Sequence, residues 1–133
     1  MVSVDEKVMN QVVHFEIPVD NMEKAKDFYS IFGWNLRDMP EMGYVGAHTT
    51  PVDENRMPKE PGAINGGMMQ RTPEVRSPVV AVQVESVDTH IGKVLSKGGS
   101  LVKEKMEIPG MGYYAYVSDP EGNVLGLWEP MTP

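Results

Sequence analysis

Hydrophobic and polar positions run in nearly the same order twice along the chain. Each copy opens with a strand-like run, at 12–17 and again at 79–84, and continues into an amphipathic helix, a glycine that ends the helix, and further strands. A module of this length is too small to bury a good core alone. The repeat therefore predicts two similar modules that pack against each other.

The first copy alternates apolar and polar residues over 11–17, which predicts a strand with one buried face. Asp20, with Glu23 three residues later, forms a capping-box pattern that predicts the start of a helix. Gly33 is expected to end this helix. The helical stripe that we expect to be buried consists of Met22, Ala25, Phe28, Tyr29 and Phe32, and the next strands are expected at 34–39, 43–49 and 63–70.

The second copy repeats this order with a strand at 79–84 and a helix at about 87–97, followed by two glycines. Its further strands are expected at roughly 100–105, 112–118 and 123–129, and the run Asp119-Pro120-Glu121-Gly122-Asn123 predicts a turn between the last two. Together the copies predict an α+β fold of two tandem βαβββ modules, whose mixed sheet curls around a concave site.

A single domain is expected over 10–131, with module one at 10–70, a linker at 71–78 and module two at 79–131, preceded by a loose arm at 1–9. The 133 residues include 41% hydrophobic residues, enough for a real interior, but no apolar run long enough to cross a bilayer. The first residues do not resemble a signal peptide. We therefore expect a cytoplasmic protein.

The charge and the cysteine count exclude several kinds of site. The formal net charge is −7 and no basic patch is visible, which argues against nucleic-acid binding. The chain has no cysteine, so disulfides, thiolate nucleophiles and thiolate metal ligands are all excluded.

Three segments carry a family resemblance that extends over most of 11–130: His14-Phe15-Glu16-Ile17-Pro18-Val19-Asp20, Phe28-Tyr29-Ser30-Ile31-Phe32-Gly33-Trp34, and the turn at 119–123. The chain resembles the vicinal oxygen chelate superfamily, which includes glyoxalase I, bleomycin-resistance proteins and extradiol dioxygenases. Within it, the chain looks most like a branch related to lactoylglutathione lyase. The resemblance implies a homodimer and a metal held by four ligands, from the first and last strand of each module.

Carried over to this chain, the four implied ligand positions hold His14, Gly66, Ala81 and Gly126. Only His14 offers a donor, and a divalent metal needs three or four. We therefore expect no metal or other cofactor, with His14 as the one candidate ligand. The two glycines would leave room for an organic ligand in place of the metal.

Alternation predicts which polar and aromatic side chains face the concave side. Glu16 shares the face of His14, Gln83 occupies the matching position in the second copy, and His48 faces inward with Tyr44. The candidate pocket residues are Glu16, His48, Gln83, Tyr114, Tyr116 and Trp128. The same pattern also fits a solvated strand edge and cross-strand packing, so it does not by itself establish a pocket.

Three functions remain open. The first is a protein that binds a small organic molecule in the concave pocket without the usual metal centre. The second is a metal-dependent lyase or dioxygenase of the glyoxalase type, with donors such as His14, His48 and Glu129, or donors from a partner chain. The third is sequestration of a toxin or drug, as in bleomycin-resistance proteins. The sequence does not decide between binding and catalysis.

Overall fold

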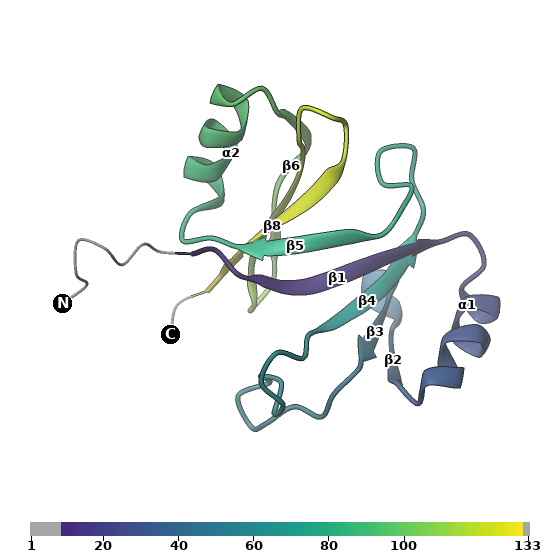
Figure 1. Ribbon diagram of the computed structural model, residues 1–133. Coiled ribbons are helices and arrows are strands. Elements are labelled where there is room, and N and C mark those ends of the chain that lie inside the picture. Colours follow the sequence, from purple (N-terminus) through teal and green to yellow (C-terminus); the bar gives the residue numbers. More distant parts are fainter. Residues whose placement is uncertain (1–8, 132–133) are drawn as a thin grey trace.

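The computed structural model describes residues 9–131 and has the predicted architecture of two βαβββ halves in one curled mixed sheet (Figure 1). The first half comprises strand β1 (Val12–Val19), helix α1 (Met22–Tyr29), the 3₁₀ turn η1 (Ser30–Phe32), strand β2 (Asn35–Met39), the 3₁₀ turn η2 (Pro40–Met42), and strands β3 (Tyr44–His48) and β4 (Asn65–Gln70). The second half comprises β5 (Val79–Gln83), α2 (Val87–Ser96), β6 (Ser100–Ile108), β7 (Gly112–Ser118) and β8 (Val124–Pro130).

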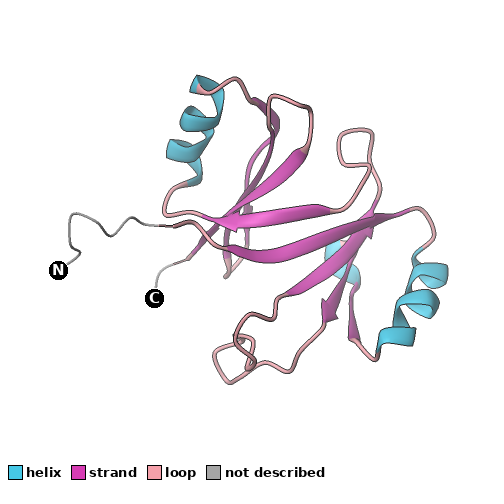
Figure 2. Ribbon diagram, in the orientation of Figure 1, coloured by secondary structure: helices cyan, strands magenta, loops and turns pink. Residues whose placement is uncertain are grey.

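The sheet order is β2-β3-β4-β1-β5-β8-β7-β6, so the two halves join edge to edge through β1 and β5. These strands are antiparallel, whereas β1–β4 and β5–β8 are parallel pairs, one in each half. The repeated pairing explains the repeated sequence pattern. In Figure 2 the two helices lie at opposite ends of the molecule, and the long strands cross between them.

Three apolar clusters form the core. Two of them lie between the sheet and the helices, one around Met68 under α1 and one around Leu127 under α2. The third joins Val75, Val79, Ala81, Tyr114 and Tyr116 on the other face of the sheet. That face is the predicted concave side, and it holds the buried polar residue Glu16 together with the two tyrosines.

The start of helix α1 differs from the prediction, whereas Gly33 ends the helical run as predicted, with a φ of 75°. Its cap is Asn21, whose side chain accepts a hydrogen bond from the Lys24 amide at 3.0 Å, and not Asp20. The predicted buried stripe is also only partly right. Met22, Ala25 and Tyr29 pack on the core, but Phe28 and Phe32 are 55% and 57% exposed. The α-helix ends at Tyr29 and continues as a tighter 3₁₀ turn, so the 3.6-residue period no longer applies at Phe32.

The strands agree with the prediction to within a few residues, and the turn at 119–123 is present. There the Asp119 carboxylate accepts backbone hydrogen bonds from Glu121 and Asn123, and Gly122 has a φ of 88°. The predicted loose arm lies, apart from Met9, outside the described residues. No helix within 9–131 is both long and apolar enough to span a bilayer.

Candidate functional site

The candidate site lies on the concave face, where β1 meets β5. Side chains alternate along a strand, so His14 and Glu16 project from the same face of β1. Across the sheet, His14 is opposite Ala81, Ala81 is opposite Gly126, and Gly126 is opposite Tyr116. This register brings the polar residues of β1 close to the tyrosines of β7, although about a hundred residues separate them along the chain.

Glu16 is the centre of the cluster. Its side chain is 7% exposed, and its Oε1 atom accepts hydrogen bonds from the Tyr116 hydroxyl and, at 3.4 Å, from the Tyr114 hydroxyl. All hydrogen bonds of this side chain within the described residues use Oε1, so Oε2 remains as a free acceptor. Burying a carboxylate is costly unless it is well paired. Among the described residues the buried side-chain atom without a partner is Thr50 Oγ1, so Oε2 of Glu16 is open to solvent or to a ligand.

Burial changes the acid–base properties of all three groups. Desolvation raises the pKa of Glu16 above its ordinary value, and the bonds from the tyrosines, together with the charge of Lys103, offset only part of this effect. The pKa values of Tyr114 and Tyr116 are raised by desolvation and then by the nearby Glu16 charge. Both hydroxyls therefore remain donors, and burial makes the Glu16 carboxylate a stronger base than an exposed one.

His14 forms a second polar pair beside this cluster. Its Nε2 atom lies 2.9 Å from the Tyr44 hydroxyl. Desolvation lowers the pKa of His14 to about 4, so the imidazole is neutral at physiological pH. Tyr44 comes from β3, and its pKa is raised by burial and by the Glu16 charge. Because the Glu16 charge acts on Tyr44, this pair lies next to the Glu16 cluster, although no hydrogen bond joins the two among the described residues.

The glycines of this face do not leave the open space that the sequence predicts. A Cβ atom at Gly126 would collide with the Tyr114 hydroxyl, and one at Gly67 would collide with the Tyr44 hydroxyl. Two tyrosine hydroxyls therefore fill the positions where side chains of 67 and 126 would begin. The prediction that the glycines leave room for a ligand is wrong at 126, because the room is taken by the protein itself.

Gly66 does not occupy the implied ligand position that the sequence assigns to it. It pairs with Phe15 and lies on the helix-bearing face, while the residue beside His14 is Asn65. The turn before β4 is one residue shorter than the turn before β8, and an offset of one residue reverses the face of a strand side chain. Asn65 Oδ1 accepts hydrogen bonds from the Thr49 and Thr50 amides at 2.7 and 3.1 Å. This oxygen is therefore used within the protein and not directed at a ligand beside His14.

The donor set does not fit the superfamily's four-ligand metal centre. The implied positions hold His14, Asn65, Ala81 and Gly126, and two of these have no donor atom. Within 9–131 no group of three or more histidine, aspartate or glutamate side chains is placed to hold a metal ion. Glu129 does not join His14, because its Oε1 accepts the Val87 amide at the start of α2.

The remaining predicted pocket residues are spread out. Trp128 lies beside Tyr114, with ring centroids 6.3 Å apart, and is half-buried. His48 is at the far end of β3 opposite Asn35, and burial followed by the Arg37 charge lowers its pKa. Gln83 is exposed at the end of β5. The structure thus brings Glu16, Tyr114, Tyr116 and Trp128 together, whereas His48 and Gln83 have no hydrogen bond to this group among the described residues.

Tyr44 faces the concave side as predicted, but its contact with His14 is not predicted from the sequence, and neither is the place of Lys103 in this group. Lys103 pairs with Tyr116 across β6 and β7, and its charge acts on Glu16. No signal in the sequence identifies Lys103, because the register of β6 shifts twice along its length.

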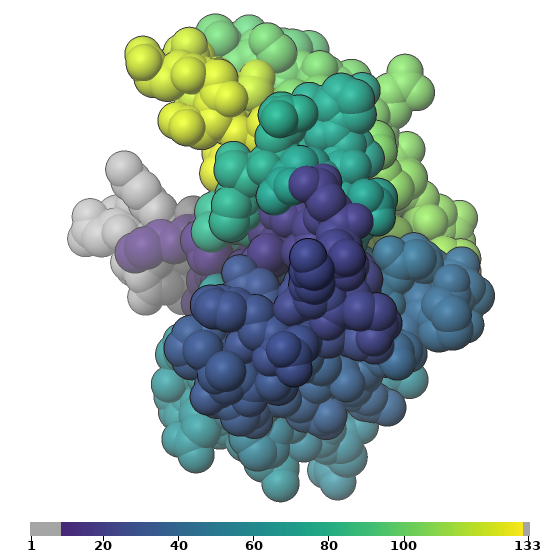
Figure 3. All heavy atoms as spheres, turned by 90° about the vertical axis from the view of Figure 1, so that its right-hand side faces the viewer, coloured from purple at the N-terminus to yellow at the C-terminus, as the bar shows by residue number. Residues whose placement is uncertain are grey.

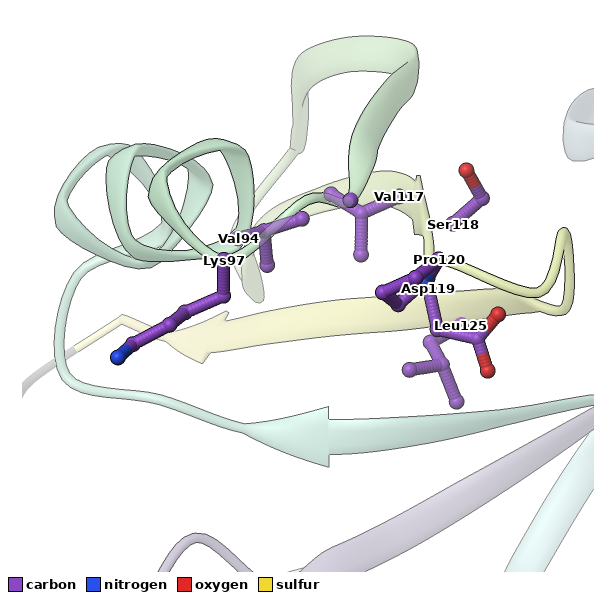
Figure 4. Close-up of a pocket in the computed structure, with 8 residues that line it drawn as sticks. Val94, Lys97, Val117, Ser118, Asp119, Pro120 and Leu125 are labelled. Carbon is purple, nitrogen blue, oxygen red and sulfur yellow. The ribbon is translucent and has the colours of Figure 1, made fainter.

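A separate small hollow of about 170 Å³ lies between the end of α2 and the β7–β8 turn (Figure 4). Its lining is mainly apolar, with Val94, Val117 and Leu125. Asp119 at its rim has a pKa lowered by its hydrogen bonds to Asn123, which brace the turn. The polar residues of this lining, Lys97, Ser118 and Asp119, include no buried carboxyl comparable with Glu16, so the cluster on the concave face is the stronger candidate.

The chain is similar in sequence to one protein family and to two curated proteins. The family described as bleomycin resistance protein-like N-terminal matches residues 11–50. The protein CFP32 of Mycobacterium bovis and of Mycobacterium tuberculosis, which carries a provisional glyoxylase name, is 28% identical over 120 residues. The alignment covers 86% of this chain but only 43% of the relative, so the chain spans less than half the length of the curated relatives it matches.

Solved structures share the fold at low identity. The protein BH1468 of Bacillus halodurans has a TM-score of 0.61 at 17% identity, with 93% of this chain and 96% of that chain covered. Methylmalonyl-CoA epimerase of Mycobacterium tuberculosis has a TM-score of 0.58 at 18% identity, with 96% and 95% covered. At such identities the likeness establishes the fold alone.

Proposed function

Because the chain resembles the vicinal oxygen chelate superfamily, we propose that its concave face binds a small organic molecule beside Glu16, without the metal centre usual in that superfamily. The observation that carries this proposal is the buried Glu16 carboxyl, held through Oε1 by Tyr114 and Tyr116 with Oε2 free. A ligand hydroxyl or amide would complete the hydrogen bonding of Oε2. The two implied ligand positions without a donor atom, Ala81 and Gly126, support a site without a metal.

The same cluster would also support proton transfer. A carboxyl with a raised pKa, next to two hydroxyl donors, is able to accept a proton from a ligand while the hydroxyls stabilise a developing negative charge. Catalysis without a metal is therefore part of this proposal. A metal-dependent lyase or dioxygenase remains the rival and would need donors from a partner chain. Sequestration of a toxin or drug would use the same pocket without turnover.

A screen of small polar organic molecules by NMR titration tests the proposal. We expect a ligand that binds the wild-type protein to lose about ten- to a hundredfold in affinity in Tyr116→Phe and Glu16→Gln variants, because each variant disturbs a buried hydrogen bond to a carboxyl. Glu85→Gln is the matched control, since Glu85 is exposed and lies outside the cluster. Unchanged affinity in Glu16→Gln would reject the site.

The metal content of the protein distinguishes a metal-dependent lyase or dioxygenase from the proposed metal-free site. Elemental analysis of the purified protein, followed by thermal unfolding with added Ni²⁺, Zn²⁺, Mn²⁺ and Fe²⁺, would detect a bound ion as a raised midpoint. Stoichiometric metal, lost in a His14→Ala variant, would favour the lyase or dioxygenase. Turnover of a ligand would distinguish an enzyme from a sequestering protein.

We also propose that the predicted homodimer forms through the exposed apolar side chains of the first half. Phe28, Ile31 and Phe32 are 55%, 66% and 57% exposed, and Phe32 packs against Trp34, which in turn contacts Phe15 of β1. Such a continuous apolar surface is typical of an interface. A second copy is the partner that fits, because a two-fold contact would cover both copies of this patch at once.

Sedimentation of the wild-type protein and an Ile31→Glu variant tests the dimer. The wild-type protein is expected to be dimeric, and the variant monomeric at the same concentration, because a charge would be buried in the contact. Leu95→Glu on α2, where Leu95 is 52% exposed, is the control and should remain dimeric. A monomeric wild-type protein would contradict the prediction.

A further inference from the structure

The segment that joins the two halves carries a single buried side chain. In the strap, defined as residues 71–78, Val75 is 1% exposed, while Pro73, Glu74, Arg76, Ser77 and Pro78 are all exposed. Val75 belongs to the concave-face cluster that contains Val79, Ala81, Tyr114 and Tyr116. Figure 3 shows the chain between β4 and β5 at the surface, between the purple-blue first half and the yellow-green second half. The strap therefore covers the same tyrosines that hold Glu16.

Hydrogen bonds hold the strap at its base. The Arg71 side chain donates to Asp20 at 2.5 Å and to the Pro18 carbonyl at 3.2 Å, and its amide donates to the Val19 carbonyl at 2.9 Å. Further along, Thr72 and Val75 bond to each other, and the Arg76 carbonyl accepts from Arg71. Among the described residues, no hydrogen bond ties 73–78 to the concave face. Apolar contact alone seats Val75 there.

We infer that the seat of Val75 is the apolar subsite of the ligand site, and that a ligand binds by replacing this side chain when the strap lifts from its base at Arg71. This inference rests on the function proposed above, which places the ligand at Glu16. The strap then acts as a built-in competitor. Only the fraction of molecules with a lifted strap is competent to bind, so the strap lowers the apparent affinity for every ligand of this site.

The contacts of Val75 define the chemical class of the ligand. The isopropyl group of Val75 packs among valine, alanine and tyrosine side chains, and Met69 packs against the same cluster. The nearest free acceptor is Oε2 of Glu16, beside the tyrosine hydroxyls. A fitting ligand has a branched alkyl group of isopropyl size joined directly to a hydroxyl, carbonyl or amide that reaches Glu16. Isobutyramide has both parts and no charge.

Titration of isobutyramide, followed by NMR, tests the inference on the full chain. A Val75→Ala variant should bind isobutyramide about tenfold more tightly than the wild-type protein, because two fewer methyl-sized groups compete for the seat. Val87→Ala is the matched control, since Val87 is 0% exposed in the cluster under α2. It should bind as the wild-type protein does. Acetamide, which lacks the branched group, should bind less tightly than isobutyramide to every variant.

A second variant guards against a folding defect. Val75→Thr keeps the shape of valine but replaces one methyl group by a hydroxyl that the apolar seat does not satisfy, so it should also bind isobutyramide more tightly. Equal affinity in the wild-type protein, Val75→Ala and Val75→Thr would overturn the inference, as would the absence of binding to all three.

The residues whose NMR resonances shift on binding show whether the strap competes with the ligand and whether the ligand binds at Glu16. If isobutyramide perturbs Glu16 and Tyr116 equally in all variants, the strap is not a competitor but the site stands. If it perturbs only residues remote from Glu16, both fail.

Discussion

A Gly126→Ala variant is expected to lose about 3 kcal/mol of unfolding free energy, at the upper end of the usual cost of overpacking a core. The added methyl group would occupy the position of the Tyr114 hydroxyl, and Tyr114 is 7% exposed and packed on Trp128. The ring must move, and its hydrogen bond to Glu16 is then lost. Urea unfolding at neutral pH measures this change.

Gly92→Ala is the control for this replacement. Gly92 lies in α2 with no atom within 4 Å of an added Cβ, and alanine favours a helix over glycine by up to about 1 kcal/mol. The same substitution should therefore stabilise the protein at 92 and destabilise it at 126. If Gly126→Ala were as stable as the wild-type protein, the Tyr114 hydroxyl could not occupy the space above Gly126.

Acidification is expected to destabilise the protein through His14 by about 2 kcal/mol between pH 7 and pH 4. The pKa of His14 falls from 6.5 to about 4 on folding, so the unfolded chain binds more protons in this window. Stability present above pH 6.5 is then lost as the pH falls toward 4. The full shift corresponds to about 3 kcal/mol, which we reduce because the side chain is partly exposed.

A His14→Gln variant isolates this contribution, because glutamine does not titrate and keeps a polar group facing Tyr44. Urea unfolding of both proteins from pH 4 to pH 7 should show the steeper acid loss only in the wild-type protein. The raised pKa of Glu16 acts in the opposite direction, since it favours the folded state below its folded pKa. It is common to both proteins, so their difference still reports His14. Parallel pH profiles would mean that His14 is solvated.

Periodicity predicts most of this fold because each half repeats a simple pattern. The alternation around Phe15 and Ile17 marks β1, and the turn at Gly122 marks the start of β8. Local rules fail where two caps compete, as at Asp20 and Asn21. Here tertiary contact decides, because Asp20 pairs with Arg71 of the strap and Asn21 is left to cap α1.

The site is predictable only as far as the faces of single strands. Alternation places Glu16, Tyr114 and Tyr116 on the concave side, but the register between β1, β5, β8 and β7 decides that they meet. A one-residue difference in turn length was enough to exchange Gly66 for Asn65. Val75 gave no signal, because one valine in a polar and proline-rich segment has no periodicity.

The β1–β5 contact has a consequence for synthesis of the chain. Strands β2, β3, β4 and β1 are complete once Gln70 has been made, yet β1 is then the open edge of a four-stranded sheet. Open edges pair readily with other chains and start aggregation. The ribosome must synthesise the strap and then β5 before that edge is covered. The strand that carries His14 and Glu16 is thus exposed on the ribosome until the second half begins to appear.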